Sequence, residues 1–128
     1  MSSYKAVYLN LQSLPNYHEG AFNDLLYQEL QGQNLDYYSI QNNSLTEAIE
    51  HLNQSCQSRQ EKILILIDES ELFFRLESGN SILNNLSALI ADCPQICFIF
   101  AGGEPWYNGF KDNTNRPLRG VKSYYLKA

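Results

Sequence analysis

Acidic residues follow an apolar run near the middle of the chain. Residues 63–67 read Ile-Leu-Ile-Leu-Ile, and Asp68, Glu69 and Glu71 all fall within the next four positions. Glu104 closely follows the second apolar run of the chain. Carboxylates that gather at the ends of neighbouring strands can bind Mg²⁺ or Ca²⁺, or exchange protons with a substrate. We therefore take Asp68, Glu69 and Glu104 as candidate ligands of an ion or a nucleotide, with solvated surface acids as the alternative.

Two further groupings could carry chemistry. His18 could join Ser13 and Asp68 in a hydrolase triad, in which the histidine takes the proton of the serine. Ser13 does not stand in the Gly-x-Ser-x-Gly turn that exposes such a nucleophile, so we favour an ordinary loop histidine and predict no catalytic residue. Cys93 and Cys97 are close in sequence, but Cys97 lies in an apolar run and is expected to point into the core, so no metal centre is predicted.

Residues 105–119 differ in character from the rest of the chain. They combine glycine, proline and asparagine with aromatic and arginine side chains, and we predict a long loop. Aromatic and arginine side chains are enriched at protein interfaces. The candidate contact residues are Trp106, Tyr107, Phe110, Arg116 and Arg119. The alternative is that the aromatic rings fold back and cover the edge of the sheet.

These residues need a framework of strands and helices to position them. Short apolar runs predict strands, continuous runs being typical of a parallel sheet, and apolar residues at helical spacing predict the segments between them. The predicted strands are 6–9, 37–40, 63–67, 96–100 and 121–126, and the predicted helices are 22–30, 44–56 and 82–90. This alternation predicts one α/β domain over residues 1–128, a three-layer sandwich around a mainly parallel five-stranded sheet in the order 2-1-3-4-5.

The predicted sandwich has too few helices to cover both faces of its sheet. The chain ends after the fifth predicted strand, so the last helix of the fold is missing, and we expect helix 22–30 on the face opposite to the other two helices. Leaving apolar side chains in water costs about 1.5–3 kcal/mol each. We therefore expect segment 105–119, a second copy of the protein or another partner to cover the exposed face, and we favour a homodimer.

The element order and length resemble those of the receiver domains of response regulators. In that resemblance Asp68 matches the aspartate at the end of the third strand, and Lys127 matches the lysine that ends the fifth. The acidic pair that holds Mg²⁺ after the first strand in that family is replaced here by Asn10 and its neighbours. The resemblance implies a flavodoxin-like fold and a regulatory role without phosphotransfer.

Residues 63–69 also resemble the Walker B segment of P-loop ATPases, an apolar strand that ends in Asp-Glu. In that family the aspartate helps to hold Mg²⁺ and the glutamate activates water. The chain has no Gly-Lys pair, so it lacks the Walker A loop that holds the phosphates. The resemblance implies an ATPase core without its phosphate loop, with Mg²⁺ as the one cofactor to consider.

Composition narrows the classes of partner. The 128 residues carry a net charge of −5, and Lys and Arg concentrate after residue 110 while acids dominate before it. This charge balance does not favour binding to nucleic acid. No apolar run is long enough to span a membrane, and the start of the chain does not resemble a signal peptide. We expect a cytoplasmic protein with a protein partner or with itself as partner.

The function favoured by these observations is a non-catalytic regulatory or protein-interaction module that docks through an exposed sheet face and residues 105–119. The alternative is a small Mg²⁺-dependent enzyme, or a nucleotide- or metal-binding protein, that uses the acids at the carboxyl ends of the strands.

Overall fold

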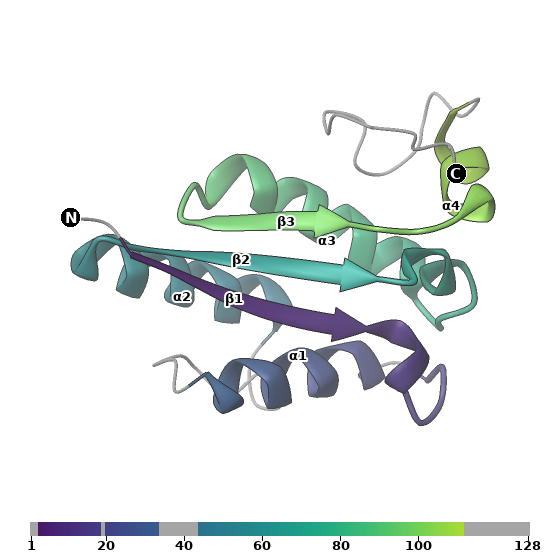
Figure 1. The fold of residues 1–128 in the computed structure, drawn as a ribbon, viewed down its shortest axis with the longest axis horizontal. Coiled ribbons are helices and arrows are strands. Elements are labelled where there is room, and N and C mark those ends of the chain that lie inside the picture. Colours follow the sequence, from purple (N-terminus) through teal and green to yellow (C-terminus); the bar gives the residue numbers. More distant parts are fainter. Residues whose placement is uncertain (1–2, 19, 34–43, 112–128) are drawn as a thin grey trace.

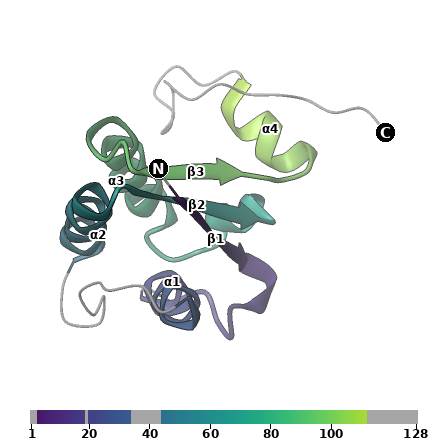
Figure 2. The same cartoon turned by 60° about the vertical axis from the view of Figure 1, so that its left-hand side comes forward.

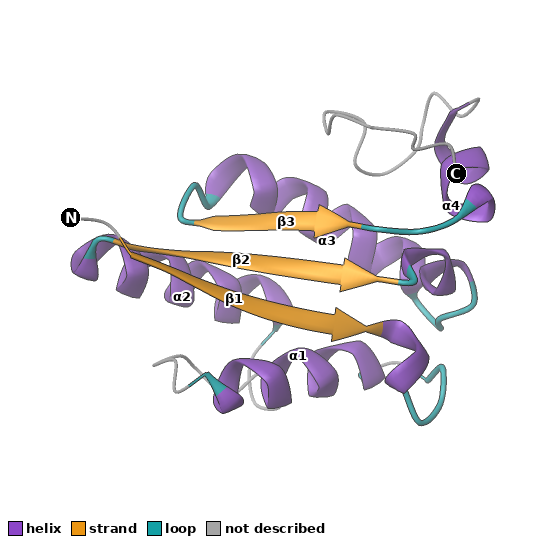
Figure 3. Cartoon of the chain, in the orientation of Figure 1, coloured by secondary structure: helices purple, strands orange, loops and turns teal. Residues whose placement is uncertain are grey.

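A computed structural model describes residues 3–18, 20–33 and 44–111 (Figure 1). Three strands alternate with helices along the chain (Figure 3). The elements are β1 (Ser3–Asn10), α1 (Ala21–Gly32), α2 (Leu45–Arg59), β2 (Glu61–Asp68), α3 (Gly79–Asp92), β3 (Ile96–Phe100) and α4 (Glu104–Lys111), with short 3-10 helices η1 (Leu11–Ser13) and η2 (Ser70–Phe74).

The described sheet is parallel throughout and has the order β1-β2-β3. This arrangement confirms a parallel α/β fold, and it places the predicted first, third and fourth strands side by side as expected. The sheet has three strands in the described residues, where five were predicted. The other two, at 37–40 and 121–126, fall outside the residues that the structure describes.

Within the described residues, helices cover one face of the sheet and leave the other open. Along β2, Ile63, Ile65 and Ile67 are fully buried, while Leu64 and Leu66 between them stay partly exposed. The buried strand residues form one core cluster with the apolar stripes of α1, α2 and α3. Figures 1 and 2 show these three helices on the same side of the sheet.

The prediction of a three-layer sandwich with helix 22–30 on the opposite face is therefore wrong for the described residues. Right-handed crossovers that all step in one direction along a sheet place their helices on one face. The described strands follow one another in that way, so α1 joins α2 and α3. Among the described residues, the exposed strand side chains lie on the face opposite to all three helices, and this follows from the direction of stepping. Cys97 lies on that open face and is exposed, not in the core as predicted.

The beginnings of α2 and α4 differ in how well the sequence predicts them. The Ser44 side chain caps α2 by accepting a hydrogen bond of 3.1 Å from the backbone N–H of Glu47, as serine often does at the N-cap of a helix. Residues 104–111, by contrast, form helix α4 where a loop was predicted. Pro105 is tolerated there because backbone N–H groups in the first turn of a helix have no intrahelical acceptor. Residues 112–119 of the predicted loop lie outside the described part of the chain.

The described helices are also too short or too polar to cross a lipid bilayer.

Candidate functional site

The carboxyl ends of the three strands bring the predicted acids to one edge of the sheet. Asp68 ends β2, and the strand register sets it beside Asn10 of β1. One carboxylate oxygen of Asp68, Oδ2, accepts a hydrogen bond of 2.7 Å from the Tyr8 hydroxyl, and Oδ1 accepts one of 2.8 Å from the backbone N–H of Glu69. Both oxygens of this carboxylate thus already have partners within the chain.

The turn after Asp68 is held against the end of β3. Glu69 takes the left-handed backbone conformation, with φ of 56°, which non-glycine residues adopt at a cost of about 1–2 kcal/mol. The next residue, Ser70, is fully buried and donates twice, from its backbone N–H to the Ala101 carbonyl at 2.9 Å and from its hydroxyl to the Ile67 carbonyl at 2.8 Å. These bonds fix the positions of Glu69 and Glu71.

Glu69 and Glu71 interact with each other. A hydrogen bond to the Glu71 side chain, followed by burial and by the negative charges of Glu71 and Asp68, raises the pKa of the Glu69 carboxyl above its ordinary value of 4.5. On its other side, Glu71 Oε2 accepts a long bond of 3.4 Å from the Gly103 N–H. A side chain at Gly102 would meet both Trp106 Cβ at 2.6 Å and Glu71 Oε2 at 2.8 Å, so the site has no spare room there.

The ring of Trp106 folds back onto the end of the sheet. It stacks on Phe100 with ring centres 5.8 Å apart, and it lies 5.5 Å from Phe74 and 6.3 Å from Phe73. Trp106 is therefore a half-buried part of the core edge. Helix α4 begins at Glu104 and includes the backbones of Tyr107 and Phe110. The side chains of Tyr107 and Phe110 are outside the described part of the structure. The other candidates, Arg116, Arg119 and Lys127, lie entirely outside it.

Asp68, Glu69 and Glu71 lie close together without forming a cation cage. In the described ranges, no three side chains of His, Cys, Asp or Glu are grouped so that they could hold a metal ion together. The reason is visible in the contacts above, because Asp68 turns towards Tyr8 and Glu71 towards Gly103. Sequence reasoning missed Tyr8, although strand alternation places its side chain on the same face as that of Asp68.

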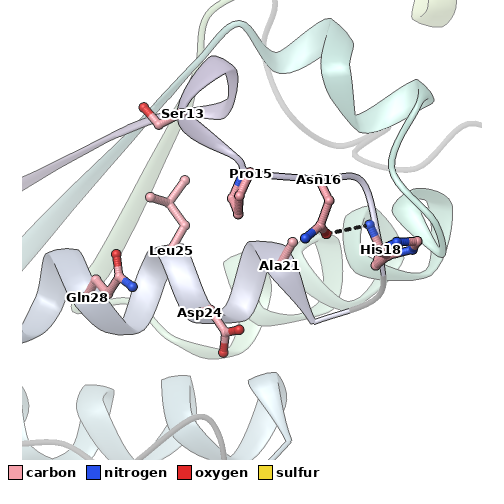
Figure 4. Close-up of a pocket in the computed structure, with 8 residues that line it drawn as sticks. All are labelled: Ser13, Pro15, Asn16, His18, Ala21, Asp24, Leu25 and Gln28. Carbon is pink, nitrogen blue, oxygen red and sulfur yellow. Dashed lines mark hydrogen bonds between the residues drawn. The ribbon is translucent and has the colours of Figure 1, made fainter.

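Ser13, His18 and Asp68, the possible triad that the sequence did not favour, have separate surroundings in the structure. Ser13 and His18 line an open pocket of about 290 Å³ at the start of α1, shown in Figure 4, and Asp68 is not among its lining residues. The His18 side chain is largely exposed and lies 3.6 Å from Glu77, measured between Nδ1 and Oε2. The pocket is lined by Ser13, Pro15, Asn16, His18, Ala21, Asp24, Leu25 and Gln28.

The Tyr8–Asp68 pair makes the free energy of unfolding depend on pH in the alkaline range. The hydrogen bond to Asp68, and after it burial and the charges of Asp68 and Glu69, raise the pKa of the Tyr8 hydroxyl above its ordinary value of 10. The folded protein then holds this proton more tightly than the unfolded chain does. The resulting stabilisation is complete below pH 10 and is lost as the pH rises through the raised pKa.

We therefore expect Tyr8→Phe to flatten the alkaline part of the curve of unfolding free energy against pH, measured by urea denaturation at several pH values. Tyr17→Phe, at an exposed tyrosine outside this site, should keep the wild-type curve. An alkaline decline of the same size in Tyr8→Phe and wild type would show that the pair does not contribute.

Comparisons with known proteins identify a fold and no family. No family model and no curated protein matches the chain. Among solved structures, the chain is similar to a Walker-type ATPase of Pyrococcus abyssi, with a TM-score of 0.72 and 16% sequence identity over 92% of this chain. The chain spans 40% of the length of that ATPase. At this identity the similarity shows the fold alone, and it supports the resemblance to an ATPase core, not the resemblance to receiver domains.

Proposed function

We propose that this protein is a non-catalytic interaction module that binds a protein partner through the face of its sheet opposite to α1, α2 and α3. We call this surface the open face. Its apolar members are Tyr4, Ala6, Tyr8, Leu64, Leu66, Cys97 and Ile99. The observation that carries the proposal is their exposure: Tyr4 is 70% exposed, Tyr8 50% and Ile99 46%.

A sheet face that contacts water normally carries polar side chains, whereas the open face carries mostly apolar ones. Its charged residues in the described strands are Lys62 and Asp68, which stand at opposite ends of β2, and the middle of the face is apolar. Contiguous apolar surface of this kind marks binding sites in soluble proteins. Tyrosine contributes a large contact area to an interface while losing little conformational entropy.

The acids at the strand ends support a structural role. Asp68 has both oxygens bonded within the chain, and Glu71 accepts a long bond from the backbone N–H of Gly103. These bonds join β1, β2 and the segment after β3 and so hold the strand ends together at the carboxyl edge of the sheet.

Cys97 provides a direct test, because it is the exposed cysteine of the open face. Cys56 and Cys93 are buried, and burial raises the pKa of both thiols, so a maleimide should label Cys97 first. We expect fast labelling of Cys97 in dilute purified protein and at least about tenfold slower labelling inside cells that make the protein naturally, because a docked partner excludes the reagent.

The control is the variant Cys97→Ser with Ser55→Cys, which moves the thiol to α2, an element that packs on the covered face. Its labelling relative to a free thiol standard should not change between dilute protein and cells. Equal labelling of Cys97 in both settings would remove the open face as a docking site.

A second candidate function is nucleotide binding, which the similarity to a Walker-type ATPase favours together with the Asp68-Glu69 pair at the end of β2. It predicts that Mg²⁺ with ATP raises the melting temperature and that Asp68→Asn abolishes this shift, while Asp92→Asn at the exposed end of α3 preserves it. We expect no shift in wild type. A shift that depends on Asp68 would replace the interaction module by a nucleotide-binding protein.

A further inference from the structure

We infer that the partner on the open face is a second copy of this chain, stacked face to face with its strands running antiparallel. The inference rests on the proposed function, because it names the occupant of the same surface. It follows from how charge and side-chain size are distributed along the face.

Residues of the open face form four rows across the sheet, which the strand register defines. Each row contains the residues that are directly paired on neighbouring strands. From the amino to the carboxyl ends of the strands, the rows are Tyr4 and Lys62; Ala6, Leu64 and Cys97; Tyr8, Leu66 and Ile99; and Asn10 and Asp68.

The two charges of the face are complementary under one two-fold axis. Lys62 and Asp68 lie on the same strand and the same face, about 20 Å apart at 3.3 Å per residue. A two-fold axis between two stacked sheets, perpendicular to the strands and level with Ile65, places Lys62 opposite the partner's Asp68. Because the axis is two-fold, the same pair forms again at the other end.

Side-chain size is complementary under the same axis. The axis places the second row of one copy opposite the third row of the other. Ala6 then faces the partner's Tyr8, Cys97 faces the partner's Ile99, and Leu64 faces the partner's Leu66. In two of these three pairs a small residue meets a large one, and side chains of the inner faces of two stacked sheets interdigitate in this way.

The other simple two-fold arrangement is unfavourable. An axis parallel to the strands would set Lys62 against the partner's Lys62 and Asp68 against the partner's Asp68, so like charges would meet at both ends. Like charges opposed across an interface cost free energy and suppress wrong pairings. The charges therefore select the antiparallel stack.

The size of the face sets the expected affinity. Three strands span about 14 Å by 20 Å, a smaller patch than the roughly 800 Å² per partner of a standard interface. We expect a dimer that dissociates in the micromolar range, so sedimentation velocity of the full chain over a wide concentration series should show monomer passing into dimer.

Charge reversal tests the arrangement itself. Lys62→Glu and Asp68→Lys should each weaken self-association by at least about tenfold, since each sets like charges against each other at both ends. An equimolar mixture of the two variants should associate again, because each pair then contains one acid and one lysine. The mixture should form a heterodimer with an affinity close to that of wild type.

Matched controls change charge without touching the open face. Arg59→Glu and Glu50→Lys lie on α2, which packs on the covered face, and should leave self-association unchanged. Circular dichroism and melting temperature show whether each variant is folded. If Asp68→Lys does not fold, Ile99→Arg replaces it, and self-association should again be lost.

Three results would overturn the inference: a wild-type protein that stays monomeric at all concentrations, a dimer that both charge reversals leave intact, or a mixture that does not recover. If purified protein stays monomeric while Cys97 is protected in cells, the open face binds a different protein, and only the identity of the occupant is wrong. If Cys97 is labelled equally fast in both settings, the proposed function fails as well.

Discussion

We expect Gly79→Ala to lower the free energy of unfolding by about 3 kcal/mol, at the upper end of the usual cost of overpacking. Gly79 is the first residue of α3, and a methyl group there would overlap the carbonyl oxygen of Phe73 and lie 3.1 Å from its carbonyl carbon. Both atoms are backbone, so the clash cannot be relieved by a side-chain rotation. Urea denaturation followed by circular dichroism measures the loss.

Gly32→Ala is the matched control. Gly32 ends α1, and an added methyl group would have no atom within 4 Å. Alanine also has a helix propensity better than glycine by up to about 1 kcal/mol, so this variant should be as stable as wild type or slightly more stable. Equal losses in the two variants would mean that the turn before α3 can shift to admit a methyl group.

Phe73→Ala should have an effect of similar size through lost packing. The Phe73 ring is 1% exposed and lies 5.3 Å from Phe22 of α1 and 6.3 Å from both Phe100 of β3 and Trp106 of α4. Removing a buried phenylalanine side chain costs about 3–5 kcal/mol. Because this ring joins three elements, we expect the midpoint of urea denaturation to fall strongly.

The neighbouring residue provides the comparison. Phe74 is 45% exposed and contacts Trp106 from the outside, with ring centres 5.5 Å apart. Phe74→Ala should cost less than about 1.5 kcal/mol, since little apolar surface leaves the core. A loss as large as that of Phe73→Ala would place the Phe74 ring in the core instead of at its edge.

The strands and helix stripes were predictable because their signals are local. The apolar run at 63–67 lies inside β2, which ends at Asp68, and the stripe from Leu45 to Cys56 is buried along α2. Periodicity of this kind needs no knowledge of distant contacts. The position of Asp68 and Glu69 at the carboxyl end of the central strand follows from the same reasoning.

The faces of the sheet could not be predicted in the same way. Leu64, Leu66 and Ile99 are as apolar as their buried neighbours, so the sequence pattern indicates two covered faces where the described structure has one. Which face the helices cover depends on the direction in which the chain steps along the sheet, and no local pattern records that direction.

Helix α4 was missed for a tertiary reason. Pro105 and Gly109 are typical of a loop, and they outweigh the weak helical preference of their neighbours. The helix is held by contacts distant in sequence, because Trp106 packs against Phe73 and Phe74, more than 30 positions earlier. Similarly, the Tyr8–Asp68 bond joins residues that are 60 positions apart.

The position of Trp106 also provides an optical reporter. It is the only tryptophan of the chain, and its ring is half buried against Phe100 at the edge where the three strands end. Intrinsic indole fluorescence, excited selectively over the nine tyrosines, therefore reports on that edge without any added dye. A spectral shift that precedes loss of the circular dichroism signal would reveal α4 detaching before the sheet unfolds.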